Sequence, residues 1–148
     1  MTIGERIRRF FAGLNSLART AMPRDAGDYL SRGLDRHLRG DLAGAIEDYD
    51  RAIAHSADGE SRAIAYLTRG NARRDKGDLA GAIADYSQAI ARQPGNAGAY
   101  LSRAQAYRAL GETEQAIADL QIVRELTVNP GWRNEAQEQL RVLQGGQS

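Results

Sequence analysis

The sequence contains no cysteine among its 148 residues. This absence excludes disulfides, thiolate metal sites and a cysteine nucleophile, and it is consistent with a reducing compartment. We therefore expect a cytoplasmic protein, with a periplasmic or membrane-peripheral location as the alternative.

Long hydrophobic runs and an excess of charge of either sign are also absent. No apolar stretch approaches the roughly 18 residues that are needed to span a bilayer. The chain carries 20 Lys and Arg against 19 Asp and Glu. This balance gives no general attraction for a polyanion, so we expect no nucleic-acid partner. With 42% hydrophobic and 26% charged residues, the composition is that of an ordinary globular domain.

The main feature of the sequence is an internal repeat. The letters GDLAGAI occur at residues 40–46 and again at residues 77–83. Upstream, these two copies read YLSRG and YLTRG, and a weaker third copy reads YLSRA and then GETEQAIADL (residues 29–33, 66–70, 100–104 and 111–120). From Gly40 to Gly77 the offset is 37 residues, and from Gly77 to Gly111 it is 34. A period between 20 and 50 residues is typical of stacked repeats.

Each copy contains two segments of helical period, and a short turn joins them. The equivalent triplets are Arg-Gly-Asp, Lys-Gly-Asp and Leu-Gly-Glu, at residues 39–41, 76–78 and 110–112. Glycine can adopt the left-handed conformation that ends the first helix, and the acidic residue can cap the second. An adhesion motif is the alternative for Arg-Gly-Asp, but its recurrence as Lys-Gly-Asp favours a turn.

Small residues recur where the two helices of a copy would cross closely. They are Gly33, Gly70 and Ala104 in the first helices and Ala45, Ala82 and Ala116 in the second. We interpret the duplicated letters as packing residues rather than catalytic ones.

The pattern resembles that of the tetratricopeptide repeat family, over about residues 26–128. The second copy fits the family pattern best, with Tyr66, Gly70, Gly77, Ala82, Tyr86, Ala89 and Pro94. The resemblance implies an all-α fold, a short right-handed α-solenoid of three helix-turn-helix repeats. Its expected divisions are an amphipathic helix and linker, three repeats, and a capping helix with a tail (residues 1–25, 26–62, 63–96, 97–128 and 129–148).

Both ends of the array carry apolar stripes. At the C-terminal end, Trp132, Ala136, Leu140 and Leu143 form a stripe that we interpret as the packed side of a final helix. At the N-terminal end, large apolar residues from Ile3 to Leu17 lie opposite arginines, and residues 1–25 carry a net charge of about +3. This segment is a helix packed on the first repeat, a helix that binds a membrane or a partner through residues 3–21, or a targeting segment.

No catalytic or metal-binding motif is recognisable. The two histidines, His37 and His55, do not stand in a metal-ligand spacing. We interpret the acidic residues of the helices as solvated surface residues, namely Asp35, Glu47, Asp48, Asp50, Asp85 and Asp119. We therefore expect no enzymatic activity, no metal and no cofactor.

A binding groove follows from the family resemblance. In proteins that resemble this one, the first helices of successive repeats line a concave groove that holds a peptide or helix of a partner. Transferred position by position, the groove residues are Leu30, Leu34, His37, Leu38, Leu67, Thr68, Asn71, Arg74, Leu101, Ser102, Gln105 and Arg108.

The composition of this groove changes along its length. It is expected to be apolar at Leu34 and Leu38, and polar and partly cationic toward Arg74 and Arg108. For the other leucines, packing between neighbouring helices is the alternative.

We expect a protein-interaction module that binds an amphipathic segment and is a monomer or a weak homodimer. The alternative is a small secretion or envelope-assembly helper that uses its N-terminal helix on a membrane or for dimerisation, similar in architecture to small bacterial secretion chaperones. Related domains hold the acidic tails of heat-shock chaperones with a Lys, Asn and Arg clamp. The matching positions here are Leu30, Leu34, Thr68, Gly98 and Ser102, so we expect no binding of such a tail.

Overall fold

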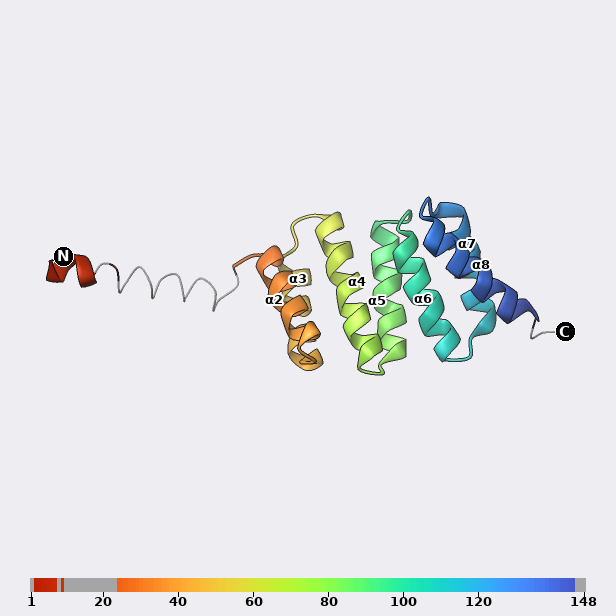
Figure 1. The fold of residues 1–148 in the computed structure, drawn as a ribbon, viewed down its shortest axis with the longest axis horizontal. Helices are drawn as coiled ribbons and strands as arrows, with labels where there is room; N and C mark the ends of the chain where they lie inside the picture. The colour runs from red at the N-terminus through yellow and green to blue at the C-terminus, as the bar shows by residue number, and fades with distance from the viewer. Residues whose placement is uncertain (1, 8, 10–23, 146–148) are drawn as a thin grey trace.

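The computed structural model describes residues 2–7, 9 and 24–145, and this part of the chain is helical without any strand. Residues 3–7 are helical, and the helices that follow are α2 (Ala26–Leu38), α3 (Leu42–His55), α4 (Gly59–Asp75), α5 (Leu79–Arg92), α6 (Ala97–Ala109), α7 (Thr113–Leu126) and α8 (Pro130–Gly145). From α2 onward they form three helix pairs in a row, closed by α8 (Figure 1). The expected all-α solenoid is confirmed. No helix in the described part has the length and apolar character needed to cross a membrane.

The duplicated heptad builds the turn between the two helices of a pair. Gly40, Gly77 and Gly111 have φ angles of 82°, 92° and 78°, as predicted for glycines that end a helix in the left-handed conformation. Asp41 then caps α3 by accepting a hydrogen bond from the Gly44 amide at 3.0 Å, and the second repeat has the same arrangement. In the third repeat Glu112 begins α7 without a side-chain capping bond.

The small residues of the first helices are required by the rings of the second helices. A Cβ atom on Gly33 would lie 2.6 Å from the Tyr49 ring, and one on Gly70 would lie 2.7 Å from the Tyr86 ring. In the third repeat the residue equivalent to these glycines is Ala104, and Leu120 replaces the tyrosine in the same core cluster. The close crossing was predicted, but the contact is with the aromatic ring rather than with the small residue of the partner helix.

Alanines on the first helix of each later pair form the seam with the preceding pair. Ala72 of α4 packs on Ala45 and Tyr49, and Ala106 of α6 packs on the equivalent residues of the second pair. The equivalent residue in the first pair is Asp35, which is exposed. Two helical turns earlier, the fully buried Ala65 and Ala99 correspond to the exposed Asp28. The first pair therefore presents carboxylates where later pairs present a packing surface.

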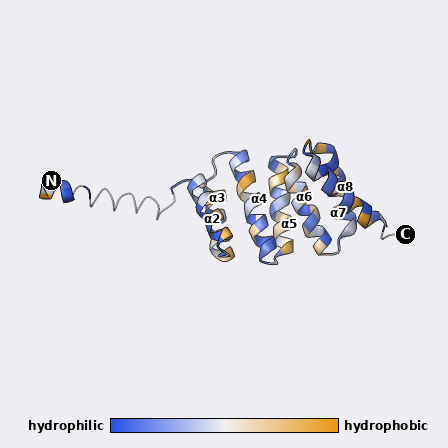
Figure 2. Ribbon diagram, in the orientation of Figure 1, coloured by the Kyte–Doolittle hydropathy of each residue, from blue (hydrophilic) through white to orange (hydrophobic). Residues whose placement is uncertain are grey.

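The C-terminal helix closes the other end of the stack. Ala136 and Leu140 enter the core cluster of the third pair, with Leu143 packed against it. Trp132 is 41% exposed and its indole lies beside Gly98, so this member of the predicted stripe is not a core residue. Hydrophilic and hydrophobic residues are mixed along the helices of the stack (Figure 2).

The predicted N-terminal stripe lies mostly outside the described residues. Of its members, Ile3 is 78% exposed and Ile7 is 49% exposed.

Candidate functional site

The first helices of the pairs, together with α8, are joined side to side by polar contacts. His37 Nε2 of α2 lies 2.8 Å from Asp75 Oδ2 of α4. Arg74 of α4 donates to the side-chain oxygen of Gln105 of α6 at 3.4 Å. Gln105 in turn donates to Glu135 of α8 at 3.2 Å. We call these contacts the polar ladder, and the surface of α2, α4, α6 and α8 that carries it the inner face.

The polar residues of the predicted groove lie on this inner face, but much of their bonding capacity is already used within the chain. Besides the ladder members, Arg108 donates to the Gln139 side-chain oxygen at 3.4 Å. The Thr68 hydroxyl donates to the carbonyls of its own helix, at 3.0 Å to Ile64 and 3.1 Å to Ala65. A peptide would have to compete with these bonds.

The leucines of the predicted groove divide into packed and exposed ones. Leu101 is only 7% exposed and belongs to the core cluster of the third pair, so we remove it from the groove. Leu30 and Leu67 are partly buried against the cores of the first and second seams. Leu34 and Leu38 are 51% and 80% exposed, although both are large apolar residues on one face of α2.

The expected cationic character toward the C-terminal end is offset by acidic neighbours. Arg74 Nε lies 3.4 Å from Asp75 Oδ1, and Gln105 links Arg74 to the carboxylate of Glu135. Sequence reasoning missed Glu135 and Gln139, because it treated α8 only as a cap. The signal was that α8 continues the series of first helices.

A shallow pocket of about 320 Å³ opens between α6 and α8. It is lined by Gln105, Arg108, Ala109 and Gln139. Arg108 is exposed, so its guanidinium offers a positive charge at this pocket that a ligand can reach from solvent.

The first and second pairs differ in the hydrogen bonding of the buried tyrosine hydroxyl of the second helix. Tyr86 Oη donates to Asn71 Oδ1 at 2.9 Å. Tyr49 is fully buried as well, but its Oη has no hydrogen-bond partner among the described residues. By the 37-residue offset, Leu34 takes the place of Asn71. Burial raises the pKa of Tyr86 to about 12 and also raises the pKa of Tyr49.

Three of the acidic residues that we interpreted as solvated are instead buried in ion pairs. Asp48, Asp85 and Asp119 are 1%, 2% and 3% exposed. Each accepts two hydrogen bonds from an arginine 16 residues earlier, as in the second pair, where Arg69 Nε and Nη2 lie 2.9 and 2.7 Å from the Asp85 oxygens. These hydrogen bonds raise the pKa of Arg69.

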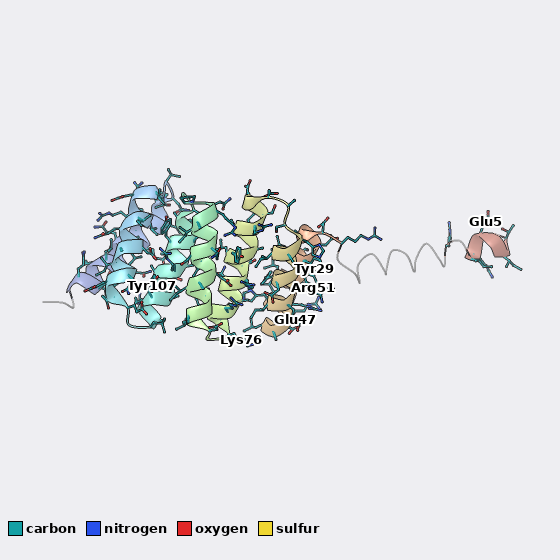
Figure 3. The ribbon with its side chains drawn as sticks, turned by 180° about the vertical axis from the view of Figure 1, so that it is seen from behind. Glu5, Tyr29, Glu47, Arg51, Lys76 and Tyr107 are labelled. Carbon is teal, nitrogen blue, oxygen red and sulfur yellow. The ribbon has the colours of Figure 1, made fainter. Side chains whose placement is uncertain are left out.

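The burial of these aspartates has a physical reason. A buried charge is stable only when it is paired and hydrogen-bonded, so these aspartates fix the two helices of a pair to one another. They are structural residues. In the described part of the chain, no group of three or more His, Asp or Glu side chains is placed to hold a metal ion. In Figure 3, which shows the molecule from behind, the labelled Glu47 and Arg51 belong to α3, and Lys76 lies at the turn after α4.

Comparisons with known proteins agree with this architecture. A model described as TPR repeat matches residues 70–111, and one described as tetratricopeptide repeat matches residues 99–126. No curated protein sequence matches the chain. The structure of MamA is similar, with 24% identity, coverage of 99% of this chain and 85% of that one, and a TM-score of 0.76.

Two further similar structures were determined with partners. The Yersinia enterocolitica type III secretion chaperone SycD, in complex with a peptide of the translocator YopD, is 17% identical, with 82% and 94% coverage and a TM-score of 0.75. The first TPR of Spaghetti (RPAP3), bound to the HSP90 peptide SRMEEVD, is 24% identical, with 82% and 92% coverage and a TM-score of 0.72.

Proposed function

Because this chain is a tetratricopeptide repeat protein, we propose that it is a protein-interaction module whose inner face binds a peptide segment of a partner. SycD and the first TPR of Spaghetti, which are similar to it, were determined with bound peptides. The partner of this chain is set by the side chains of its own inner face.

The observation that carries the proposal is the exposure of Leu34 and Leu38. The equivalent residues of α4 are Asn71 and Asp75, which are hydrogen-bonded to Tyr86 and to His37. In α2, by contrast, two leucines one helical turn apart face solvent, 51% and 80% exposed. Apolar surface on a face that is otherwise polar favours an apolar ligand side chain.

The ligand that fits is amphipathic. Its apolar side chains cover Leu34 and Leu38, and an acidic group reaches Arg108 at the pocket between α6 and α8. Burying an apolar anchor contributes about 1.5–3 kcal/mol before the cost of ordering the peptide. Two or three anchors correspond to reversible binding in the micromolar range.

Leu34→Arg tests this function. It places a charge in the apolar part of the inner face, so we expect it to abolish partner capture while the circular dichroism of the helices stays unchanged. The matched control is Leu126→Arg, because Leu126 is a 41% exposed leucine at the end of α7, away from the inner face. A protein that is cross-linked to the wild type and to the control, but not to Leu34→Arg, would be the partner. Equal capture by all three would refute the groove assignment.

A second candidate function is that of a secretion or envelope-assembly helper attached to an anionic membrane by its N-terminal segment. Two observations favour it. The first is that Ile3 and Ile7 are exposed. The second is that α2 has the exposed Asp28 and Asp35 at the positions where the later pairs have the alanines of the seam, so a preceding helix cannot pack there in the same way. A stripe of apolar residues opposite arginines suits a lipid interface.

Flotation with vesicles of phosphatidylcholine and phosphatidylglycerol separates the two candidates. We expect the full chain to float with anionic vesicles and Ile7→Asp to stay behind. Leu34→Arg should float like the wild type, because the inner face takes no part. If the wild type also stays behind with anionic vesicles, the membrane function is refuted.

A further inference from the structure

The hydroxyl of Tyr49, in the first pair, lacks a hydrogen-bond partner among the described residues. Its Oη is buried and has no hydrogen-bond partner there. The second pair shows that the same fold can complete this group, since Tyr86 Oη donates to Asn71 Oδ1 at 2.9 Å. A single amide at position 34 would do the same for Tyr49, yet the residue there is leucine.

Arg36 and His37, which follow Leu34 along α2, have partners elsewhere. His37 is in contact with the Asp75 carboxylate at 2.8 Å. Arg36 donates to the Gly44 carbonyl at 3.1 Å, and it lies 3.2 Å from Asp48. A rearrangement within α2 would therefore give Tyr49 a partner only by breaking another contact.

Leu34 covers the position that Asn71 fills in the second pair, and it is 51% exposed. A half-exposed side chain can change rotamer into open solvent without disturbing the core. Because Asn71 reaches Tyr86 Oη from the equivalent position of α4, a ligand group that displaces Leu34 can approach Tyr49 Oη from the same side.

We propose that Tyr49 Oη is a hydrogen-bond donor reserved for the ligand of the inner face. The ligand places an apolar side chain on Leu34 and Leu38 and presents a neutral oxygen to Tyr49, namely a backbone carbonyl that is not already bonded within a helix. A carboxylate does not fit here, because burying an unpaired charge between leucines is costly and Asp48 lies beside the ring. This inference rests on the proposed function, because it assigns one contact within the same surface.

The need for a free carbonyl also constrains the ligand backbone. Carbonyls in the interior of an α-helix are bonded to amides four residues later, so they are not free acceptors. The ligand is therefore extended, or ends a helix, at the residue that lies over Leu34.

The test uses the full chain and a phage-displayed library of random dodecapeptides. Peptides are selected on the wild type, and those that also bind Leu34→Asn are removed. This variant lacks the leucine and gives Tyr49 an acceptor within the chain. Affinities of the selected synthetic peptides are then measured by fluorescence polarisation for the wild type, Tyr49→Phe and Tyr86→Phe.

We expect Tyr49→Phe to weaken binding by about three- to tenfold, the usual range for loss of one hydrogen bond. Tyr86→Phe, the matched control, should change affinity less than about twofold, because its hydroxyl is already bonded within the chain. Equal affinity for Tyr49→Phe and the wild type would overturn the role of the hydroxyl, while the groove function would stand. If no peptide depends on Leu34, both the groove function and the role of the hydroxyl are refuted.

Discussion

The two equivalent tyrosines predict opposite effects of the same substitution on stability. Tyr49→Phe removes a buried hydroxyl that has no partner among the described residues, whereas Tyr86→Phe removes one that donates to Asn71. An unpaired buried polar group costs about 1–3 kcal/mol, and a satisfied hydrogen bond contributes about 0.5–1.5 kcal/mol. We therefore expect Tyr49→Phe to raise the free energy of unfolding by about 1 kcal/mol and Tyr86→Phe to lower it by about 1 kcal/mol.

Urea denaturation followed by circular dichroism measures the difference. With a slope of about 2 kcal/mol per molar urea, the midpoints of the two variants should differ by about 1 M. Each ring stays in contact with its glycine, so packing is the same in both comparisons.

Leu34→Asn completes the experiment as a double-mutant cycle. It gives Tyr49 the acceptor that Asn71 gives Tyr86, so it should stabilise the wild type more than it stabilises Tyr49→Phe, with a coupling of about 1 kcal/mol. The reasoning is refuted if Tyr49→Phe destabilises the protein as much as Tyr86→Phe does. A stabilising Leu34→Asn that no longer binds peptide would show that the first pair gives up stability for binding.

Three further predictions follow from the packing and from the inner face. Gly33→Ala should lower the free energy of unfolding in urea titrations by about 1–3 kcal/mol, because the new methyl overlaps the Tyr49 ring. The double variant with Tyr49→Leu recreates the alanine and leucine pair of the third repeat, so it should recover most of this loss. Asp85→Ala should cost about 3–5 kcal/mol, because it removes the buried carboxylate that Arg69 and Arg73 both contact and leaves Arg69 with only the half-exposed Asp50. Asp50→Ala, at a 51% exposed carboxylate, should cost less than about 1 kcal/mol, and equal losses in thermal unfolding would contradict the structural role of the buried pairs. The peptide SRMEEVD should show no saturable fluorescence polarisation up to about 100 μM, since the clamp positions supply no cation; binding at low micromolar concentration would disprove this prediction.

The fold was predictable because the repeat presents the same signals three times. Turn glycines and small residues recur in all three copies and capping aspartates in the first two, so each copy supports the interpretation of the others. Gly40 and Gly77 could be assigned to left-handed turns from the triplets alone, and their φ angles confirm it.

The arginines and aspartates of the buried ion pairs recur at the same spacing in the sequence, but a single copy does not show that they pair. Arg69 and Asp85 are 16 residues apart and meet only because the two helices of a pair run antiparallel. An aspartate beside a glutamate or an alanine on a helix looks like an ordinary surface residue. The recurrence of the same spacing in all three copies was the available signal.

The polar contacts of the inner face could not be predicted from the sequence. Leu34 and Leu38 are exposed, whereas Leu101 lies in the core cluster with Leu120, the leucine that replaces the second-helix tyrosine in the third repeat. The offsetting charge at Glu135 comes from α8, which lies outside the repeated letters.

Asp28 and Asp35 disfavour the stacking of a further helix pair on the outer side of α2. A further helix pair stacked against the outer side of α2 would have to bury two carboxylates at positions where the later pairs bury alanines, and it would also cover the exposed ion pair of Asp35 with Arg39. Stacking another copy of the chain on this surface, in the way the later pairs stack, is therefore unfavourable.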